Sequence, residues 1–304
     1  MTSWTTFNKE QETVGLLGCG RMGCCMLEAM LNAGYRVAVY DAFPAAAEKA
    51  ASKGALSAGS PAELAKKATI IIMSLPGPEQ LAETIFGENG MLSALSDRHI
   101  VIDTSTVDPK TTQHNAKQLG AKGAAYLDSP ILGRPSAVGK WMLPTGGDES
   151  ALERAKPILL TFAANAMCVG ESGAGNALKL LNQMMFSCIN AISAEVLAIA
   201  DHVGISKEMF YNVVANSSAA TVSGLFREAG KNIVADDYCS PAFTVDLLLK
   251  DARLALQMAK DSNAPSVIAG TVQMYNDIAH AQGLGEQCSS ALYKVFSNHY
   301  KTLN

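Results

Sequence analysis

The sequence lacks the features of several large classes of protein. No run of about 18 apolar residues is present, which argues against a transmembrane helix. The first dozen residues are polar and have no apolar centre, so they do not resemble a signal peptide, and we expect a cytoplasmic protein. Lys and Arg are scattered through a chain of net charge −4, which predicts neither nucleic-acid binding nor membrane binding.

Metal-binding and hydrolase patterns are missing as well. The five histidines are distant from one another in sequence, and they form no metal-ligand spacing with the seven cysteines. We therefore expect no metal site. The cysteines also show no disulfide pattern, which favours reduced thiols. No serine lies in the Gly-x-Ser-x-Gly pattern of nucleophilic hydrolases.

A glycine-rich turn between two short apolar segments is the most informative feature that is present. Residues 14–17 are apolar and lead into Gly18, Gly20 and Gly23, and after a helical pattern a second apolar segment, 37–40, ends in an acid. This order is typical of a dinucleotide-binding strand–helix–strand unit. Gly18 permits a tight turn, Gly20 lets the backbone approach a pyrophosphate, and Gly23 lets the helix pack closely. Cofactor contacts are expected along the whole turn, at Gly18, Cys19, Gly20, Arg21, Met22 and Gly23.

The acid that ends the second segment, Asp41, indicates which nicotinamide cofactor binds. A carboxylate at this point can accept hydrogen bonds from the adenosine ribose diol, and it repels a 2′-phosphate. The next residues, 42–44, include no Lys or Arg that could receive such a phosphate. The sequence therefore favours NAD, with NADP as the less favoured cofactor.

The chain is expected to form two domains after a loose polar tail, residues 1–13. Short β-rich segments alternate with helical ones up to about residue 170, which predicts an N-terminal Rossmann domain with a doubly wound parallel sheet over 14–172. Its clearest strands are 70–75 and 100–103, and ligands bind beyond the carboxyl ends of such strands. Further cofactor contacts are accordingly expected at Leu75, Pro76, Ser105 and Thr106.

The second half, residues 173–304, is predicted to be an all-α domain joined through a long helix. An apolar-rich stretch extends from 176 to about 203, and helical patterns continue to 295 without a convincing strand. A helix this apolar cannot be covered by solvent alone. We expect it to pack within its own domain and against a second subunit, in a homodimer or homotetramer. The predicted fold class is thus α/β, with an all-α C-terminal domain.

Lys179, one turn into this long helix, is the best candidate for a catalytic group. An enzyme that transfers hydride to a carbonyl needs a proton donor beside the forming alkoxide. The positive end of the helix dipole disfavours an ammonium at this position, and burial would act in the same direction. Asn182 and Gln183 follow on the same face of the helix, where they could orient the substrate or the lysine.

These segments together resemble the β-hydroxyacid dehydrogenases, the family that contains 3-hydroxyisobutyrate and tartronate semialdehyde reductases. The resemblance extends from residue 14 to about 296. It is carried by GLLGCGRMG at 15–23, IDTST at 102–106, LDSPILG at 127–133, GAGNALKLLNQ at 173–183 and LKDARLAL at 249–256.

The resemblance implies an NAD(P)-dependent oxidoreductase that interconverts a small anionic hydroxy acid and its aldehyde or keto form. Lys179 would be the general acid/base, and Asn182 or Gln183 would hold the substrate. Lys250 and Asp251 would lie near the cofactor and the cleft between the domains. For Asp251 a structural role is favoured over a catalytic one.

The segment 128–134 departs from the family's pattern. The family usually has Asp-x-Pro-Val-Ser-Gly-Gly, whose Ser and glycines bind the substrate carboxylate, whereas here Leu132 replaces the serine and Arg134 the second glycine. A guanidinium can form a bidentate pair with a carboxylate, sulfonate or phosphate, and sulfolactaldehyde-type reductases of the family carry a similar Gly-Arg. Arg134 is either such an anion clamp or a structural arginine. Substrate contacts are expected at Ser129, Leu132, Gly133 and Arg134.

Two alternative functions remain open on these residues. Imine reductases are related, lack the same serine and have a proline soon afterwards, as at Pro135. They generally replace the lysine and prefer NADPH, so Lys179 and Asp41 argue against them. Leu132 could also mark a dinucleotide-binding sensor that has lost turnover, although the presence of Lys179 with Asn182 argues for an enzyme.

Overall fold

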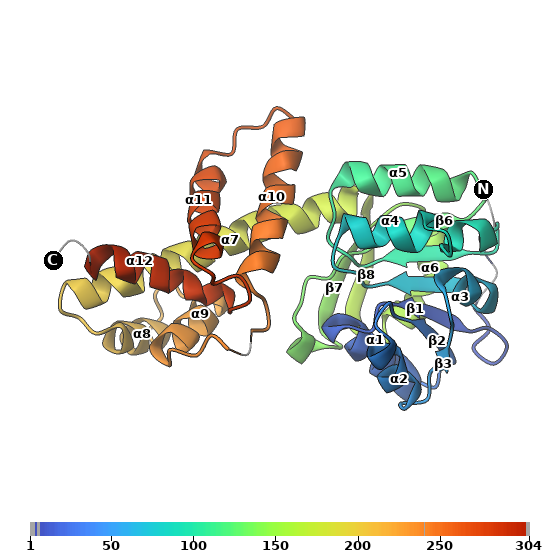
Figure 1. Ribbon diagram of the computed structural model, residues 1–304, viewed down its shortest axis with the longest axis horizontal. Helices are drawn as coiled ribbons and strands as arrows, with labels where there is room; N and C mark the ends of the chain where they lie inside the picture. Colours follow the sequence, from blue (N-terminus) through green and yellow to red (C-terminus); the bar gives the residue numbers. More distant parts are fainter. Residues whose placement is uncertain (1–3, 5–6, 240, 302–304) are drawn as a thin grey trace. The chain divides into compact units, whose positions relative to one another are not determined.

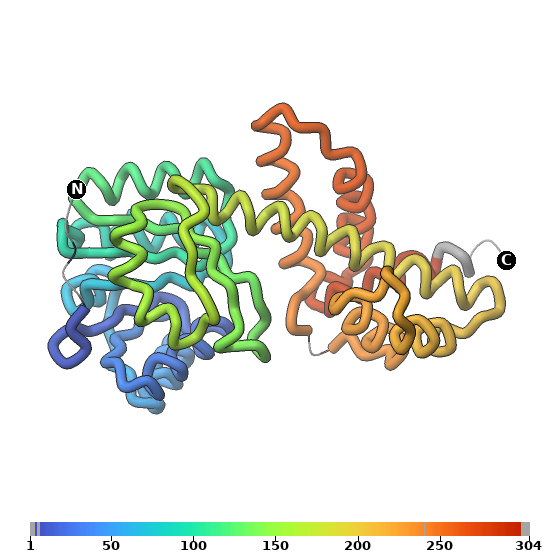
Figure 2. Tube along the Cα trace, turned by 180° about the vertical axis from the view of Figure 1, so that it is seen from behind, coloured from blue at the N-terminus to red at the C-terminus, as the bar shows by residue number. Residues whose placement is uncertain are grey.

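The structure, a computed structural model, describes residues 4, 7–239 and 241–301. It divides into two compact units, Met1–Lys179 and Leu180–Asn304. Figure 2 traces the chain through both units, from blue at the N-terminus to red at the C-terminus. The sequence placed the domain boundary between residues 172 and 173, whereas the units divide inside a helix, because the first turn of that helix is bonded to the sheet of the first unit.

The first unit contains an eight-stranded sheet in the order β3-β2-β1-β4-β5-β6-β7-β8 (Figure 1). The order reverses direction at β1, with β2 on one side and β4 on the other, so the sheet is doubly wound as predicted. The strands are β1 (Val14–Leu17), β2 (Val37–Tyr40), β3 (Leu56–Ser57), β4 (Ile70–Met73), β5 (Ile100–Asp103), β6 (Ala125–Asp128), β7 (Trp141–Gly146) and β8 (Ala163–Gly170).

One pairing in this sheet departs from the parallel arrangement. β7 runs antiparallel to β6, and the two meet only where Asp128 lies opposite Gly146. A parallel neighbour needs a crossover of a dozen or more residues, usually a helix. The segment between the two strands holds only one short 3-10 turn, η2 (Pro135–Ala137), so the chain reverses instead.

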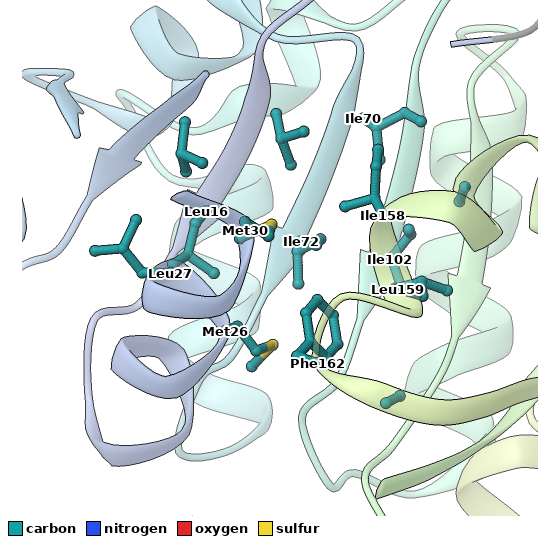
Figure 3. Packing of buried hydrophobic residues seen from close by; sticks show 14 of the residues in the cluster. Leu16, Met26, Leu27, Met30, Ile70, Ile72, Ile102, Ile158, Leu159 and Phe162 are labelled. Carbon is teal, nitrogen blue, oxygen red and sulfur yellow. The ribbon is translucent and has the colours of Figure 1, made fainter. Parts of the chain in front are cut away.

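Helices cover both faces of the sheet, as a doubly wound fold requires. One face packs against α1 (Arg21–Asn32) and α6 (Glu149–Leu159), and Figure 3 shows Met26, Ile72 and Phe162 in this core. The opposite face packs against α3 (Pro61–Lys67), α4 (Pro78–Phe86) and α5 (Pro109–Gly120). A further helix, α2 (Pro44–Ala51), follows β2.

The stretch predicted as a loose tail, residues 1–13, is attached to the first unit where it is described. Trp4 and Phe7 are partly buried against the α1/α6 core. Glu12 forms an ion pair with Arg154 of α6 at 2.6 Å. The apolar area that the two aromatic rings remove from water explains why this part is not loose. Residues 1–3 and 5–6 of the tail lie outside the described residues.

The second unit is helical, as predicted. Within its described residues the only β-type pairing is an isolated bridge between Thr244 and Cys288. Its core brings together apolar side chains from α7, α9, α10, α11 and α12. After α7 (Ala174–His202), which begins in the first unit, the helices are α8 (Lys207–Ala215), α9 (Gly224–Val234), α10 (Val245–Asp261), α11 (Val267–Ala281) and α12 (Leu292–Lys301).

The long helix α7 is 29 residues in length. By length and composition it could cross a membrane, and half of its most apolar 18-residue stretch is buried within the structure. Helices in the cores of soluble proteins can have the same length and composition. The absence of a membrane segment therefore stays a prediction from the sequence.

Candidate active site

The glycine turn between β1 and α1 has the geometry that its sequence predicts. Gly18 has a φ of +93°, a conformation that residues with a Cβ rarely adopt. A Cβ on Gly23 would lie 2.0 Å from the carbonyl oxygen of Gly18, so only glycine lets α1 approach the turn this closely. A Cβ on Gly20 would meet no protein atom within 4 Å. That side of Gly20 is open to a ligand.

The N-terminus of α1 can accept an anion. Gly20 is its N-cap residue and makes no side-chain capping bond, and the first turn contains no acid. Free backbone N–H groups and the positive end of the helix dipole favour a phosphate at such a terminus. Of the flanking residues, Arg21 is exposed, Met22 is half-buried and Cys19 is buried. The pyrophosphate of a dinucleotide fits this turn.

Asp41 braces the same turn from the end of β2. Its Oδ2 accepts a hydrogen bond from the backbone N–H of Cys19 at 2.7 Å, and its Oδ1 accepts one from Phe43 at 2.8 Å. The side chain is half-buried, and a carboxylate has capacity for further donors. Asp41 is thus fixed next to the glycine turn, where it can also accept from a hydroxyl pair.

The thiols around the turn are poorly suited to redox chemistry. Burial raises the pKa of Cys19 to about 12, and burial also raises the pKa of Cys25. The thiolate is the reactive form of cysteine, so these side chains stay protonated at neutral pH. Each of the seven cysteines is free in the structure.

The loops after β4 and β5 are tied together at the carboxyl edge of the sheet. The backbone N–H of Leu75 donates to Ser105 Oγ at 3.0 Å, and Ser105 is buried. Pro76 is exposed and Thr106 is half-buried, so both can meet a ligand at this edge. The hydroxyl of Ser105 holds the two loops in register.

Two buried carboxylates lie side by side at the ends of β5 and β6. Asp103 and Asp128 are opposite each other in the strand register, and both are fully buried. Burial raises the pKa of Asp103 to about 6, although it accepts hydrogen bonds from Ser105 and from the hydroxyl of Tyr126. Burial also raises the pKa of Asp128, against the opposing effect of the backbone N–H groups of Gly173 and Asn176. The sequence predicted no role for either acid.

The segment that departs from the family pattern lies against β7. Leu132 and Met142 exchange two backbone hydrogen bonds, of 2.9 and 3.2 Å. The indole of Trp141 occupies the space that a Cβ on Gly133 would need, 2.1 Å from Cδ1, and its N–H donates to the carbonyl of Arg134 at 2.7 Å. The loop is therefore held by its backbone, and Arg134 is half-buried.

The side chain of Ser129 is held inside the first unit. It is fully buried, and its Oγ shares a hydrogen bond with Thr145 Oγ1 at 2.8 Å. The hydroxyl connects the start of the loop to β7, and a substrate contact at Ser129 stays a prediction. Its position in the loop was predictable from the sequence, but its partner was not.

Lys179, the last residue of the first unit, contacts this loop. Its Nζ donates a hydrogen bond to the carbonyl oxygen of Ile131 at 2.8 Å, and the side chain is half-buried. The predicted proton donor and the predicted anion-binding segment thus lie together within one compact unit.

The remaining predicted residues belong to the second unit. Gln183 is buried, and its amide donates to Asp251 Oδ2 at 2.5 Å, while its Oε1 accepts from Asn182 at 3.2 Å. Lys250 lies 2.9 Å from Asp251 Oδ1. These contacts link α7 with α10 and agree with a structural role for Asp251. The amide of Gln183 is thus held on both sides, and its contact with a substrate stays a prediction.

Metal ligands do not gather anywhere in the part of the chain that the structure describes. No group of three or more His, Cys, Asp or Glu side chains is placed to hold an ion.

Two family models match the chain. Residues 13–170 match the NAD binding domain of 6-phosphogluconate dehydrogenase, and residues 173–296 match the NAD-binding domain of NADP-dependent 3-hydroxyisobutyrate dehydrogenase. Together they extend over almost the whole described chain.

Individual relatives agree with these models. The 3-sulfolactaldehyde reductase of Escherichia coli is 33% identical over 92% of this chain and 94% of its own length. A 3-hydroxyisobutyrate dehydrogenase structure from Salmonella typhimurium is 28% identical, with a TM-score of 0.85 over 94% of this chain and all of its own. An imine reductase structure from a Pseudomonas species, 23% identical over 93% of this chain and 99% of its own with a TM-score of 0.59, shares the fold alone. The chain therefore belongs to the β-hydroxyacid dehydrogenase family and is an NAD(P)-dependent oxidoreductase that acts on the CH–OH group of small hydroxy acids.

Proposed function

We propose that the chain is an NAD-dependent reductase that interconverts a small anionic aldehyde and its hydroxy acid, with Lys179 as general acid/base. The observation that carries the proposal is the 2.8 Å contact between Lys179 Nζ and the carbonyl of Ile131. This contact connects Lys179, the proton donor that the family resemblance implies, with the loop that carries Arg134. A proton source and an anion-binding group are the two elements that such a substrate requires.

Each part of the proposed site has its own task. A nicotinamide dinucleotide held at the glycine turn supplies or accepts the hydride. The N–H groups of Gly20 to Gly23 hold its pyrophosphate. Lys179 Nζ gives a proton to the alkoxide oxygen as the aldehyde is reduced, or removes it in the oxidative direction. Arg134 and the backbone of 132–134 hold the anionic end of the substrate.

The preference for NAD rests on Asp41, and it gives a testable prediction. Asp41→Asn keeps the size of the side chain but removes the charge that repels a 2′-phosphate. We expect the ratio of kcat/KM with NADH to kcat/KM with NADPH to fall by about tenfold to a hundredfold, which corresponds to the loss of about 1.5–3 kcal/mol from a charged hydrogen bond. Initial rates with each cofactor measure this ratio. Glu48→Gln in α2 makes the same charge change at an exposed position and should leave the ratio unchanged; an unaltered ratio in Asp41→Asn would remove the argument for NAD.

The substrate is proposed to carry a strong anion. Leu132 offers no hydroxyl to a carboxylate, whereas the guanidinium of Arg134 can pair with a sulfonate, phosphate or carboxylate. The relative from Escherichia coli is named for a sulfonated aldehyde, which makes 3-sulfolactaldehyde the first candidate. A panel of short aldehydes that bear each anion, assayed by NADH consumption, tests the proposal. Tight NADH binding without turnover of any aldehyde would instead indicate a sensor, and reduction of cyclic imines with NADPH would indicate an imine reductase.

A second prediction concerns Arg134 itself. Arg134→Ala should raise KM for the anionic aldehyde by about tenfold to a hundredfold, the cost of a lost charge-assisted hydrogen bond. The backbone carbonyl that Trp141 binds is retained in this variant. An uncharged aldehyde of the same length should show no change in KM. Lys140→Ala removes an exposed charge from the same segment as a control; equal KM values for Arg134→Ala and wild type would identify Arg134 as a structural arginine.

Self-association through the helical unit is the third prediction. Met185 and Ile192 of α7 are 65% and 53% exposed, and Val267 of α11 is 78% exposed. Exposed apolar surface on this scale is typical of an interface. We expect a homodimer or homotetramer, and Ile192→Lys should shift the light-scattering mass to that of a monomer. Phe43→Ser, at an apolar residue of the first unit that is 76% exposed, should not; a monomeric wild type would contradict the prediction.

A further inference from the structure

The carboxylate of Asp128 fastens the beginning of α7. Its Oδ1 accepts a hydrogen bond from the backbone N–H of Gly173, and its Oδ2 accepts one from Asn176, both at 2.8 Å. Asn176 lies in the first turn of α7 and Gly173 immediately precedes the helix, and the N–H groups at this end have no partner within the helix. The side chain itself is fully buried. Asp128 therefore acts on the start of the helix.

Glycines leave the space that this carboxylate occupies. A Cβ on Gly146 would lie 2.5 Å from Asp128 Oδ1, and a Cβ on Gly175 would lie 2.5 Å from its backbone oxygen and 3.0 Å from Oδ2. Gly173 has a φ of +100°, which brings its N–H to the carboxylate. Larger residues at these positions would displace the helix from the sheet.

A second contact holds the same turn from its other side. The side chain of Asn176 is fully buried, accepts from the backbone N–H of Val107 at 3.2 Å and donates to Thr112 Oγ1 at 3.1 Å. The first turn of α7 is thus bonded to the end of β6 and to the segment that follows β5. It has little freedom to rotate or slide.

Lys179 follows Asn176 by three residues, so the orientation of this turn sets the direction of the lysine. Asp128 also begins the loop 129–134, whose Ile131 carbonyl accepts from Lys179 Nζ. Asp128 is therefore connected to both partners of this hydrogen bond: to Lys179 through the first turn of α7, and to Ile131 through the loop. A change at Asp128 alters both ends together.

We propose that Asp128 is the positioning residue of the reaction: its carboxylate fixes the first turn of α7 so that Lys179 Nζ is held against the loop 129–134. The inference rests on the proposed role of Lys179. Asp128→Asn leaves one acceptor oxygen and presents an amide N–H₂ to a backbone donor, so one of the two bonds is lost. Because a misplacement of 1 Å can cost about a hundredfold in rate, we expect kcat to fall by at least about tenfold.

The first experiment separates positioning from general destabilisation. Asp128→Asn should lower kcat with 3-sulfolactaldehyde, or with the best aldehyde of the panel, while the Kd for NADH stays within about twofold of wild type. Glu12→Gln weakens the ion pair with Arg154 in the same unit and is the control for lost stability. A matching fall in kcat in Glu12→Gln, or an equal loss of NADH affinity in Asp128→Asn, would overturn the inference.

A double-mutant cycle with Lys179→Ala gives the sharper test. Residues that act as one unit are not additive, so the penalty of Asp128→Asn should shrink to about twofold or less once Lys179 is gone. The same penalty in both backgrounds would show that Asp128 acts independently of the lysine. If Lys179→Ala alone keeps the wild-type kcat, the proposed function fails at that step, which is a distinguishable result.

A readout without turnover makes the inference testable even if no aldehyde reacts. Reductive methylation with ¹³C-formaldehyde labels the lysine amines, and the Lys179 resonance is assigned by its loss in Lys179→Ala. This resonance should shift in Asp128→Asn and stay in place in Glu12→Gln; an unmoved resonance in Asp128→Asn would contradict the inference. If Asp128→Asn does not fold, Gly175→Ala displaces the same turn by a different contact, because its Cβ would lie 2.5 Å from the backbone oxygen of Asp128. Wild-type kcat and resonance position in that variant would overturn the inference.

Discussion

Lys179→Ala is expected to lower kcat for aldehyde reduction by about 10²–10⁴-fold, the usual contribution of a positioned general acid. The side chain is half-buried and donates to a backbone carbonyl, that of Ile131, so its removal should leave the fold intact. NADH binding should also be unchanged, because the proposed cofactor contacts lie at the glycine turn and Asp41. Single-turnover decay of NADH fluorescence measures the chemical step, and a fluorescence titration measures the Kd.

Two matched variants make this result specific. Lys179→Arg retains a positive charge, but a guanidinium does not release its proton, so it should be nearly as slow as the alanine variant. Lys156→Ala removes a lysine whose partner is Glu153 on the same helix, and it should keep full activity. A Lys179→Ala enzyme that turns over at the wild-type rate would exclude the lysine as acid/base.

The second large effect is expected at the glycine turn, where two similar substitutions should behave differently. Gly23→Ala places a Cβ 2.0 Å from the backbone carbonyl of Gly18, and neither group can rotate away. Overpacking of this kind costs about 1–3 kcal/mol or more in the free energy of unfolding. NADH affinity should fall with it, because the turn and the N-terminus of α1 separate.

Gly20→Ala is the partner variant, since its Cβ would meet no protein atom within 4 Å. Stability should stay within about 0.5 kcal/mol of wild type, while the Kd for NADH rises because the methyl group occupies the path of the pyrophosphate. Urea unfolding and an NADH titration of both variants give the comparison. Wild-type NADH affinity in Gly20→Ala would show that the cofactor does not approach the turn at this residue.

The fold could be predicted where a segment carries its own signal. The apolar run at 70–75 contains β4, and the apolar-rich stretch from 176 to about 203 forms most of α7. β3 was not predicted, because it has two residues, both exposed, and no apolar pattern. The direction of β7 was not predicted either, since it depends on the length and content of the connection and not on the residues of the strand.

In the candidate site, too, the features that depend on local sequence could be predicted, and the contacts between distant segments could not. The geometry of Gly18 and Gly23 was confirmed because glycine is required by the local backbone. Asp128 received no predicted role, because its partners Gly173 and Asn176 lie 45 and 48 residues further along the chain. The place of Ser129 in the loop was clear from the sequence, but its bond to Thr145 was not, because that bond depends on the pairing of segments 16 residues apart.

The contact of Lys179 with the loop has an evolutionary consequence, because the acceptor is a main-chain carbonyl. Every amino acid at position 131 supplies the same oxygen, so mutation of the side chains around it does not remove the acceptor. The neighbouring Leu132 is likewise tied to Met142 through the backbone. With the proposed roles, substrate preference can therefore drift through the side chains of 132 and 134 while Lys179 keeps its place, which would allow one scaffold to serve many hydroxy acids.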